Sequence, residues 1–200
     1  MSKTVQPIQT IAPMQGGKKP EVPVDPVQAD YNKGKEFLQK NELSQAAVAF
    51  HNALIGYQEK GNQQGIANAS NQMGHVCLAR GEYDHALAHY NRAWEICDKL
   101  DDPMSMLALS KQFILVYRGQ GQFKKAITVC LDLLDKYHGN NDPQGTVDVL
   151  EQMAEIYIKA GDKEKAADTY RTVASIHANF KHKNIAEGYL QKAREIEKVC

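Results

Sequence analysis

The stretch GHVCLARGEYDHALAHYNRA, residues 74–93, holds the pattern that decides the fold. Apolar residues recur at intervals of three and four, as in Leu87, Tyr90 and the following Trp94, which is the spacing of one face of a helix. Gly81 stands ahead of this pattern and tolerates positive φ, so it is suited to end one helix before the next begins. The stretch therefore predicts two helices joined by a tight turn.

The same phrase recurs every forty residues. The buried small position of the second helix is occupied in turn by Ala46, Ala86, Ala126 and Ala166. Four residues later comes a larger core residue, and five residues earlier comes a turn former: Asn41, Gly81, Gly121 and Gly161. One such helix pair cannot bury its apolar face alone, so four copies in phase predict a stacked array with a shared core.

The repeats divide the chain into three parts. Residues 27–181 hold four helix pairs, at about 27–60, 61–100, 101–140 and 141–181. Residues 1–26 contain five of the seven prolines and few large apolar side chains. Such a segment buries too little surface to offset its ordering entropy, so we expect a flexible tail. Residues 182–200 predict one more helix, the first of an unfinished fifth unit, which caps the array with its charged outer side.

Composition narrows the possible partners and compartment. Lysine plus arginine equal aspartate plus glutamate at 24 each, so no net positive charge attracts nucleic acid. No apolar run is long enough to span a membrane and no secretory signal begins the chain, so we expect a cytoplasmic protein. The four cysteines form no CxxC pair and are expected to be reduced, with Cys77 and Cys130 buried in core positions.

Several residues of the opening stretch together resemble the tetratricopeptide repeat: Gly74, Cys77, Gly81, Tyr83, Ala86, Tyr90 and Ala93. The resemblance covers residues 27 to about 180, with a period longer than the common thirty-four residues, as in the variant with longer helices. It implies an all-α fold, a right-handed superhelical solenoid of antiparallel helix pairs. The positions that carry the repeat signature are Gly34, Ala46, Gly74, Gly81, Ala86, Tyr90, Gly121, Ala126, Gly161 and Ala166.

Tetratricopeptide arrays bind extended peptides or helices on the concave surface that the first helix of each pair forms. The resemblance therefore implies a protein–protein interaction scaffold or adaptor that binds a peptide or helix of another protein. The matching concave positions are Tyr31, Lys35, Asn68, Asn71, Gln72, His75, Lys111, Gln112, Arg118, Asp148, Glu151 and Glu155. They run from polar and mildly basic to acidic, so a partner of mixed charge is expected.

One specialised role of the family is disfavoured. Some arrays hold the terminal carboxylate of a chaperone with lysines, asparagines and an arginine at set places. Here the corresponding places carry Tyr31 and Lys35 in the first repeat, Gln72 in the second, and Ala108 and Gln112 in the third. The resemblance therefore does not extend to that carboxylate clamp.

Two alternatives from other classes stay open. A metal- or redox-responsive protein would use His75, Cys77, His85, His89 and Cys97, since His85 and His89 have helical spacing. No glutamate follows His85 to complete HExxH, and no nucleophile elbow or phosphate-binding loop is present, so neither a cofactor nor an enzymatic activity is expected. The terminal helices could instead stack end to end and form a homo-oligomer.

Overall fold

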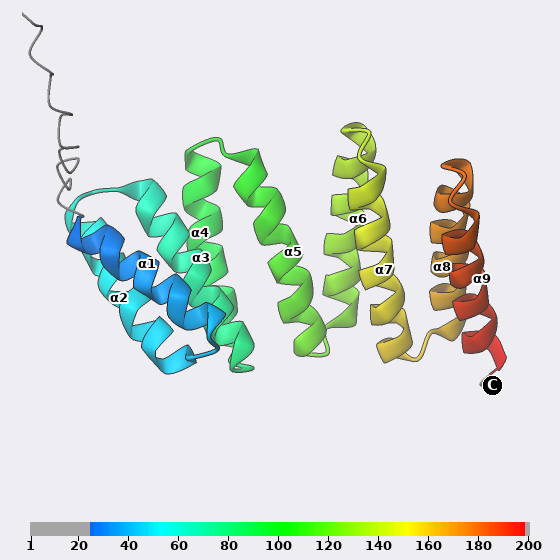
Figure 1. The fold of residues 1–200 in the computed structure, drawn as a ribbon, viewed down its shortest axis with the longest axis horizontal. Coiled ribbons are helices and arrows are strands. Elements are labelled where there is room, and N and C mark those ends of the chain that lie inside the picture. The colour runs from blue at the N-terminus through cyan, green and yellow to red at the C-terminus, as the bar shows by residue number, and fades with distance from the viewer. Residues whose placement is uncertain (1–24, 199–200) are drawn as a thin grey trace, which may run out of the picture.

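Nine helices make up the part of the chain that the computed structural model describes, residues 25–198 (Figure 1). They are α1 (Pro26–Gln39), α2 (Leu43–Glu59), α3 (Gln63–Ala79), α4 (Tyr83–Lys99), α5 (Pro103–Gly119), α6 (Phe123–Gly139), α7 (Pro143–Ala160), α8 (Lys163–Asn179) and α9 (Lys183–Lys198). Each helix packs against the next one along the chain, and this range contains no strand. The prediction of an all-α repeat solenoid is confirmed. None of these helices is both long and apolar enough to cross a bilayer.

The helices are separated by turns of one conformation. A residue with positive φ stands at every twentieth position, at Asn41, Gly61, Gly81, Asp101, Gly121, Asn141, Gly161 and Lys181. At the turn after α3, the N–H of Gly81 donates to the carbonyl of Leu78 at 3.0 Å and the N–H of Glu82 donates to that of Cys77 at 2.9 Å. This is the Schellman motif, which satisfies carbonyls at the end of a helix. The repeat of forty residues is thus built from two helix-and-turn units of twenty.

At the starts of α1, α3, α5, α7 and α8, a side chain accepts from a backbone N–H group that has no partner within the helix. Asp102 Oδ1 accepts from the N–H of Ser105 at 3.0 Å, and Asp142 Oδ1 accepts from that of Gly145 at 2.8 Å. In both helices a proline follows the cap, where its lack of an N–H does no harm. Sequence and backbone geometry therefore agree on where these helices begin.

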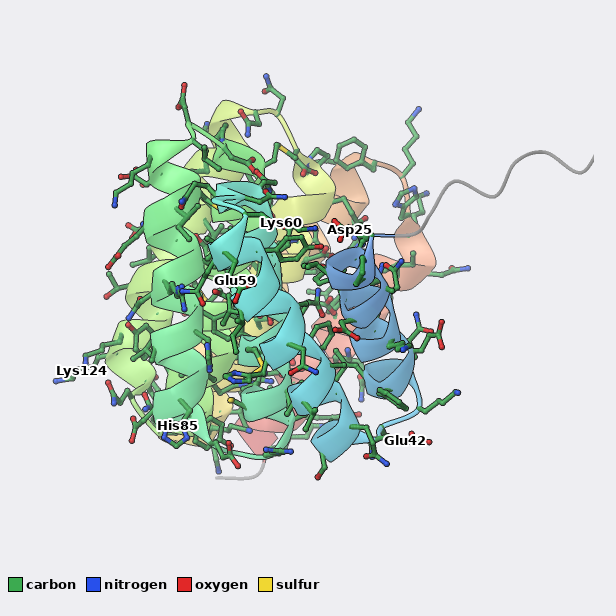
Figure 2. All side chains as sticks on the ribbon, turned by 90° about the vertical axis from the view of Figure 1, so that its left-hand side faces the viewer. Asp25, Glu42, Glu59, Lys60, His85 and Lys124 are labelled. Atoms are coloured by element: carbon green, nitrogen blue, oxygen red, sulfur yellow. The ribbon has the colours of Figure 1, made fainter. Side chains whose placement is uncertain are left out.

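The N-terminal boundary differs from the predicted one. Asp25 accepts a hydrogen bond from the N–H of Val27 at 3.1 Å, and Pro26 is the first residue of α1, although both were assigned to the tail. Pro26 is preorganised for a first helical position, which is why the helix extends to it. Lys60 Nζ holds Asp25 from the end of α2 at 2.5 Å (Figure 2). Residues 1–24 of the predicted tail lie outside the described residues, as do the last two residues, Val199 and Cys200.

Small residues let the helices approach closely. The four alanines of the repeat, Ala46, Ala86, Ala126 and Ala166, have no exposed surface. In the first two repeats, a glycine of the first helix lies directly under an aromatic ring of the second. A Cβ atom at Gly34 would come within 2.6 Å of Phe50, and one at Gly74 within 2.4 Å of Tyr90. Close packing at these points is a consequence of glycine having no side chain.

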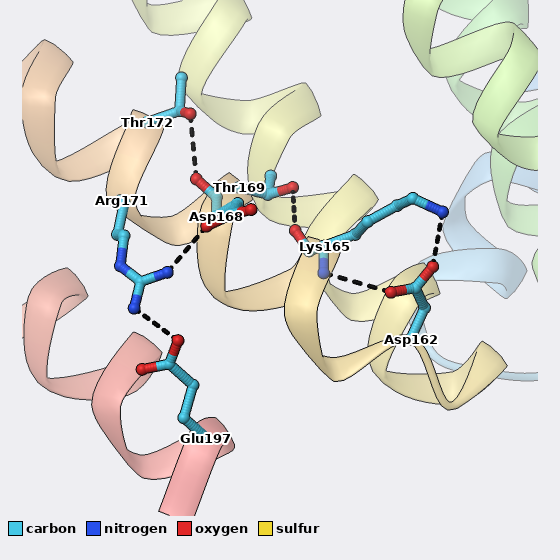
Figure 3. Close-up of polar contacts among 7 residues, drawn as sticks. All are labelled: Asp162, Lys165, Asp168, Thr169, Arg171, Thr172 and Glu197. Carbon is cyan, nitrogen blue, oxygen red and sulfur yellow. Dashed lines mark hydrogen bonds and ion pairs between the residues drawn. The ribbon is translucent and has the colours of Figure 1, made fainter.

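The last helix of the described range, α9, packs on α8. Its Tyr189, Ala193 and Ile196 pack toward α8, as the predicted continuation of the repeat requires. Another face of α9 carries Glu187, Leu190, Arg194 and Glu197. The equivalent positions of α7, forty residues earlier, hold Val147, Leu150, Ala154 and Tyr157. Arg194 pairs with Glu187 at 3.1 Å. Arg171 of α8 reaches Glu197 at 2.5 Å and Asp168 at 2.7 Å (Figure 3). Three of these four positions of α9 are therefore charged, where the equivalent positions of α7 are not.

Lys181 provides a test of the turn geometry. Its φ of 62° is a conformation that costs a side-chain-bearing residue about 1 kcal/mol and costs glycine little. We expect Lys181→Gly to raise the free energy of unfolding by about 0.5 kcal/mol, after the larger unfolded-state entropy of glycine is counted. Urea denaturation measures the change. Gly81→Ala, at a φ of 74°, is the reverse control and should lower stability by about 1 kcal/mol. A less stable Lys181→Gly variant would contradict this account.

Candidate functional site

The odd-numbered helices, α1, α3, α5, α7 and α9, form one face of the solenoid, which we call the odd-helix face. In Figure 1, α7 and α9 lie in front of α6 and α8. Three polar contacts run along this face from one odd helix to the next: Tyr31 with Gln72, Arg118 with Glu155, and Tyr189 with Glu151. All twelve residues that the resemblance assigned to the binding surface belong to α1, α3, α5 and α7.

The N-terminal half of the odd-helix face is polar and uncharged over most of α3. Asn68 is exposed, while Asn71 and Gln72 are half-buried. The Oδ1 atom of Asn71 is buried and has no hydrogen-bond partner among residues 25–198. Gln72 bonds to Tyr31, whose ring packs edge-on against Phe50 with centroids 5.7 Å apart. This half of the face therefore presents amide groups, and one of them has unused hydrogen-bonding capacity.

His75 connects this face to the core. Its Nδ1 atom lies 3.1 Å from the hydroxyl oxygen of Tyr90, and the two rings meet edge to face. Burial lowers the pKa of His75, because the imidazolium would lose hydration there. Burial also raises the pKa of Tyr90. His75 therefore serves as a neutral hydrogen-bonding group beneath the face.

The third repeat contributes positive charge. Lys111 of α5 extends over the ring of Tyr137, with its Nζ atom 5.4 Å from the ring centroid. A hydrogen bond to the Tyr137 hydroxyl raises the pKa of Lys111, so the ammonium stays charged. Gln112, the next residue, is half-buried. The contact with Tyr137 orients Lys111 and also anchors it to α6.

Charged residues of the C-terminal half pair with one another. Arg118 of α5 donates to Glu155 of α7 at 2.6 Å. Tyr189 of α9 donates to Glu151 of α7, and burial together with this carboxylate raises the pKa of Tyr189 to about 12. Asp148 accepts from Gln144 at 2.7 Å. The residues predicted to give a basic section followed by an acidic one are therefore partly neutralised within the protein. Tyr189 itself is a residue of this face that sequence reasoning missed.

The histidines and cysteines of the metal or redox alternative do not come together. His85 is 76% exposed and faces outward from α4, 3.7 Å from Glu82 (Figure 2). Cys77 and Cys97 are buried, and burial raises the pKa of each thiol. Among residues 25–198 there is no group of three or more histidine, cysteine, aspartate or glutamate side chains that could hold a metal ion. Cys130 is likewise buried, with its pKa raised to about 12.

Comparisons with known proteins agree with this architecture. Residues 148–179 match the family profile of the tetratricopeptide repeat. The fold is similar to that of the nearly identical TPR-like repeats of a Podosopora anserina kinesin light chain, with a TM-score of 0.72 and 13% sequence identity over 88% of this chain and 89% of that one. No curated protein sequence matches the chain significantly.

Two further solved structures are similar. Apo RapI has a TM-score of 0.65 at 16% identity, over 86% of this chain and 70% of that one. A double mutant of MamA RS-1 has a TM-score of 0.56 at 13% identity, over 88% and 96% of the two chains. The fold defines a class, the helical repeat solenoids. Within that class, the part of the chain in α7 and α8 matches the tetratricopeptide repeat, and the other helix pairs are similar to it in their two-helix geometry.

Proposed function

We propose that this protein is a non-enzymatic scaffold or adaptor that binds a peptide or helical segment of another protein on the odd-helix face. Tetratricopeptide-repeat folds are built for such contacts, because stacked helix pairs present a long continuous surface. The twelve residues assigned from the sequence all belong to helices of that face, which supports this proposal. Affinity would come from a few anchoring contacts and not from buried area alone.

One observation carries this proposal, the buried Oδ1 atom of Asn71, which lacks a hydrogen-bond partner among the described residues. An unsatisfied buried acceptor costs about 1–3 kcal/mol. Because the atom itself has almost no exposed surface, the half-buried Asn71 side chain would turn outward to accept from a backbone N–H of a bound peptide, which would recover that cost. Gln72 follows Asn71 on α3, and Lys111 holds the equivalent position one repeat later on α5, so the odd-helix face offers the same peptide a further amide and a charge.

The partner is expected to carry charges of both signs, with its acidic groups near Lys35 and Lys111. Because Arg118 and Glu155 already pair with each other, basic groups of the partner would compete with Arg118 for the Glu155 carboxylate. The C-terminal half of the face is therefore expected to add selectivity, and the N-terminal half is expected to supply most of the affinity.

The test is quantitative capture of proteins from a lysate of the source organism. The native protein should enrich specific partners, as measured by mass spectrometry. We expect Asn71→Ala combined with Lys111→Glu to lower that enrichment at least tenfold. Both side chains are at least partly exposed, so helicity measured by circular dichroism should be unchanged. Repeating the capture without residues 1–26 separates the contribution of the N-terminal segment.

A matched control variant makes the same two types of substitution on the even-numbered helices. Asn91 of α4 and Lys124 of α6 are both exposed, so Asn91→Ala with Lys124→Glu makes the same changes away from the odd-helix face. This control should retain the partners. Loss of the partners in the control, or their retention in the Asn71 and Lys111 variant, would move the binding site off the odd-helix face.

Self-assembly through the terminal helices is less well supported. The outer face of α9 carries the Glu187–Arg194 pair and Glu197, and burying these charges in an interface would require desolvating them. We place the protein in the cytoplasm, a reducing compartment that suits three buried free thiols, Cys77, Cys97 and Cys130.

A further inference from the structure

A pocket opens at one edge of the solenoid, and its lining contains none of the residues assigned to the odd-helix face. It lies between the α6–α7 turn and the end of α8, at the top of Figure 1. Its volume is about 500 Å³, and its walls include Tyr137, Pro143, Ile176 and Phe180. A smaller cavity of about 130 Å³ shares Pro143, Ile176 and Phe180 and extends to His177 and His182. The two cavities form one recess, which we call the edge pocket.

The edge pocket is not a general product of the repeat. Ile176 and Phe180 occupy positions that hold Lys136 and Asn140 one repeat earlier. Phe180 is the C-cap residue of α8 and is 54% exposed, although α9 begins only three residues later. Phe180 lines the recess together with Pro143 and Ile176, and such a contiguous apolar patch is typical of a contact surface. The second repeat also carries apolar residues at these positions, Ile96 and Leu100, so an aromatic ring followed directly by basic residues is what distinguishes the fourth repeat.

The side of the pocket formed by the α8–α9 turn is basic. Lys181, His182 and Lys183 follow Phe180 directly, are all exposed, and line a further shallow recess with Ile185. The first turn of α9 has no acidic residue, so the partial positive charge of the helix N-terminus adds to this potential. The acidic residue that lines the pocket is Asp142, and its Oδ1 atom is engaged by the N–H of Gly145.

From this combination we infer that the edge pocket is a second protein-binding site, for an acidic peptide segment that carries one large aromatic or aliphatic anchor. The anchor packs against Phe180 and Ile176 inside the recess. Flanking carboxylates pair with Lys181 and Lys183 at its rim. A recess of this size is in the range that holds a buried anchor residue, and the basic rim accelerates association with an acidic segment. The site is independent of the binding proposed for the odd-helix face.

Synthetic peptides test the inference by fluorescence anisotropy with the full chain. The probe is a fluorescein-labelled nonapeptide with a central tryptophan flanked by four aspartates. Two comparison peptides replace the tryptophan by serine, or the aspartates by lysines. We expect saturable binding of the first peptide, at least tenfold weaker binding of each comparison peptide, and about threefold or greater weakening in 0.5 M salt through charge screening.

Variants taken from the repeat itself locate the site. Phe180→Asn installs the residue found at position 140 and should weaken binding of the acidic tryptophan peptide at least tenfold. Leu100→Asn is the matched control, since Leu100 is the C-cap of α4 and is 44% exposed. Neither Leu100→Asn nor Asn71→Ala should change this binding, which separates the inference from the function proposed above.

Three results would overturn the inference. They are no saturable binding of the acidic tryptophan peptide, equal binding by Phe180→Asn, or equal binding of the lysine peptide. A basic turn with an exposed apolar side chain could also bind an anionic lipid surface. Sedimentation with phosphatidylserine vesicles tests that alternative. Vesicle binding that depends on Phe180, without peptide binding, would replace the acidic segment by a lipid surface.

Discussion

Replacing Tyr90 by alanine is expected to lower the free energy of unfolding by about 3–5 kcal/mol, the range for removing a large aromatic side chain from a core. Tyr90 has no exposed surface and packs with Ala67 of α3 and Val116 of α5. Its ring also meets Phe113 edge to face, with centroids 6.2 Å apart. Because one side chain joins three consecutive helices, the variant would lose contacts both within and between repeats. Urea denaturation followed by circular dichroism measures the effect.

Tyr90→Phe is the control for this prediction. It keeps the ring and removes only the hydroxyl that lies 3.1 Å from His75 Nδ1. We expect a loss of about 1 kcal/mol, the net contribution of one hydrogen bond. If the phenylalanine variant were as unstable as the alanine variant, the hydrogen bond with His75 and not ring packing would dominate at this position.

Replacing Gly74 by alanine is expected to destabilise the protein by about 2–3 kcal/mol, although alanine favours helices more than glycine does. The added methyl group would lie 2.4 Å from Cε1 of Tyr90, and that fully buried ring has little space in which to move. α3 and α4 would have to separate to relieve the overlap. Thermal and urea unfolding both report the change.

Gly188→Ala makes the same substitution without the overlap. Gly188 is exposed in the interior of α9, and a Cβ atom there would have no neighbour within 4 Å. We expect the helix propensity of alanine to raise stability by about 0.5–1 kcal/mol. The opposite signs of the two substitutions identify the steric contact at Gly74. A stable Gly74→Ala variant would show that the helix pair adjusts more easily than this packing indicates.

The fold was predictable because its determinants are local and periodic. Gly81 and Ala86 each lie in a pattern that recurs in every repeat, and the structure places them in a turn with positive φ and in the core. The turns between one helix pair and the next carried a weaker sequence signal, because Asp101, Asn141 and Lys181 adopt positive φ without being glycine. Schellman hydrogen bonds hold all of these turns in one conformation, whichever residue occupies the position.

The helices that carry the candidate site residues were predictable from the sequence, but the pairing of their charges was not. Arg118 and Glu155 were both assigned to the odd-helix face, yet their pairing depends on the offset between α5 and α7. The two residues are 37 positions apart, and no local pattern indicates that their side chains meet. The same applies to Tyr189 and Glu151, since α9 was expected as a cap without a known contact to α7.

The sequence by itself therefore determined the helix pairs, their register, the buried small residues and the polar character of the first helix of each pair. These follow from the spacing of residue types along the chain, which sets the faces of helices directly. Tertiary structure alone decided which charges neutralise each other and where Phe180 meets the α6–α7 turn to form a pocket. Such contacts depend on how successive repeats are offset in space, and spacing along one helix does not encode that offset.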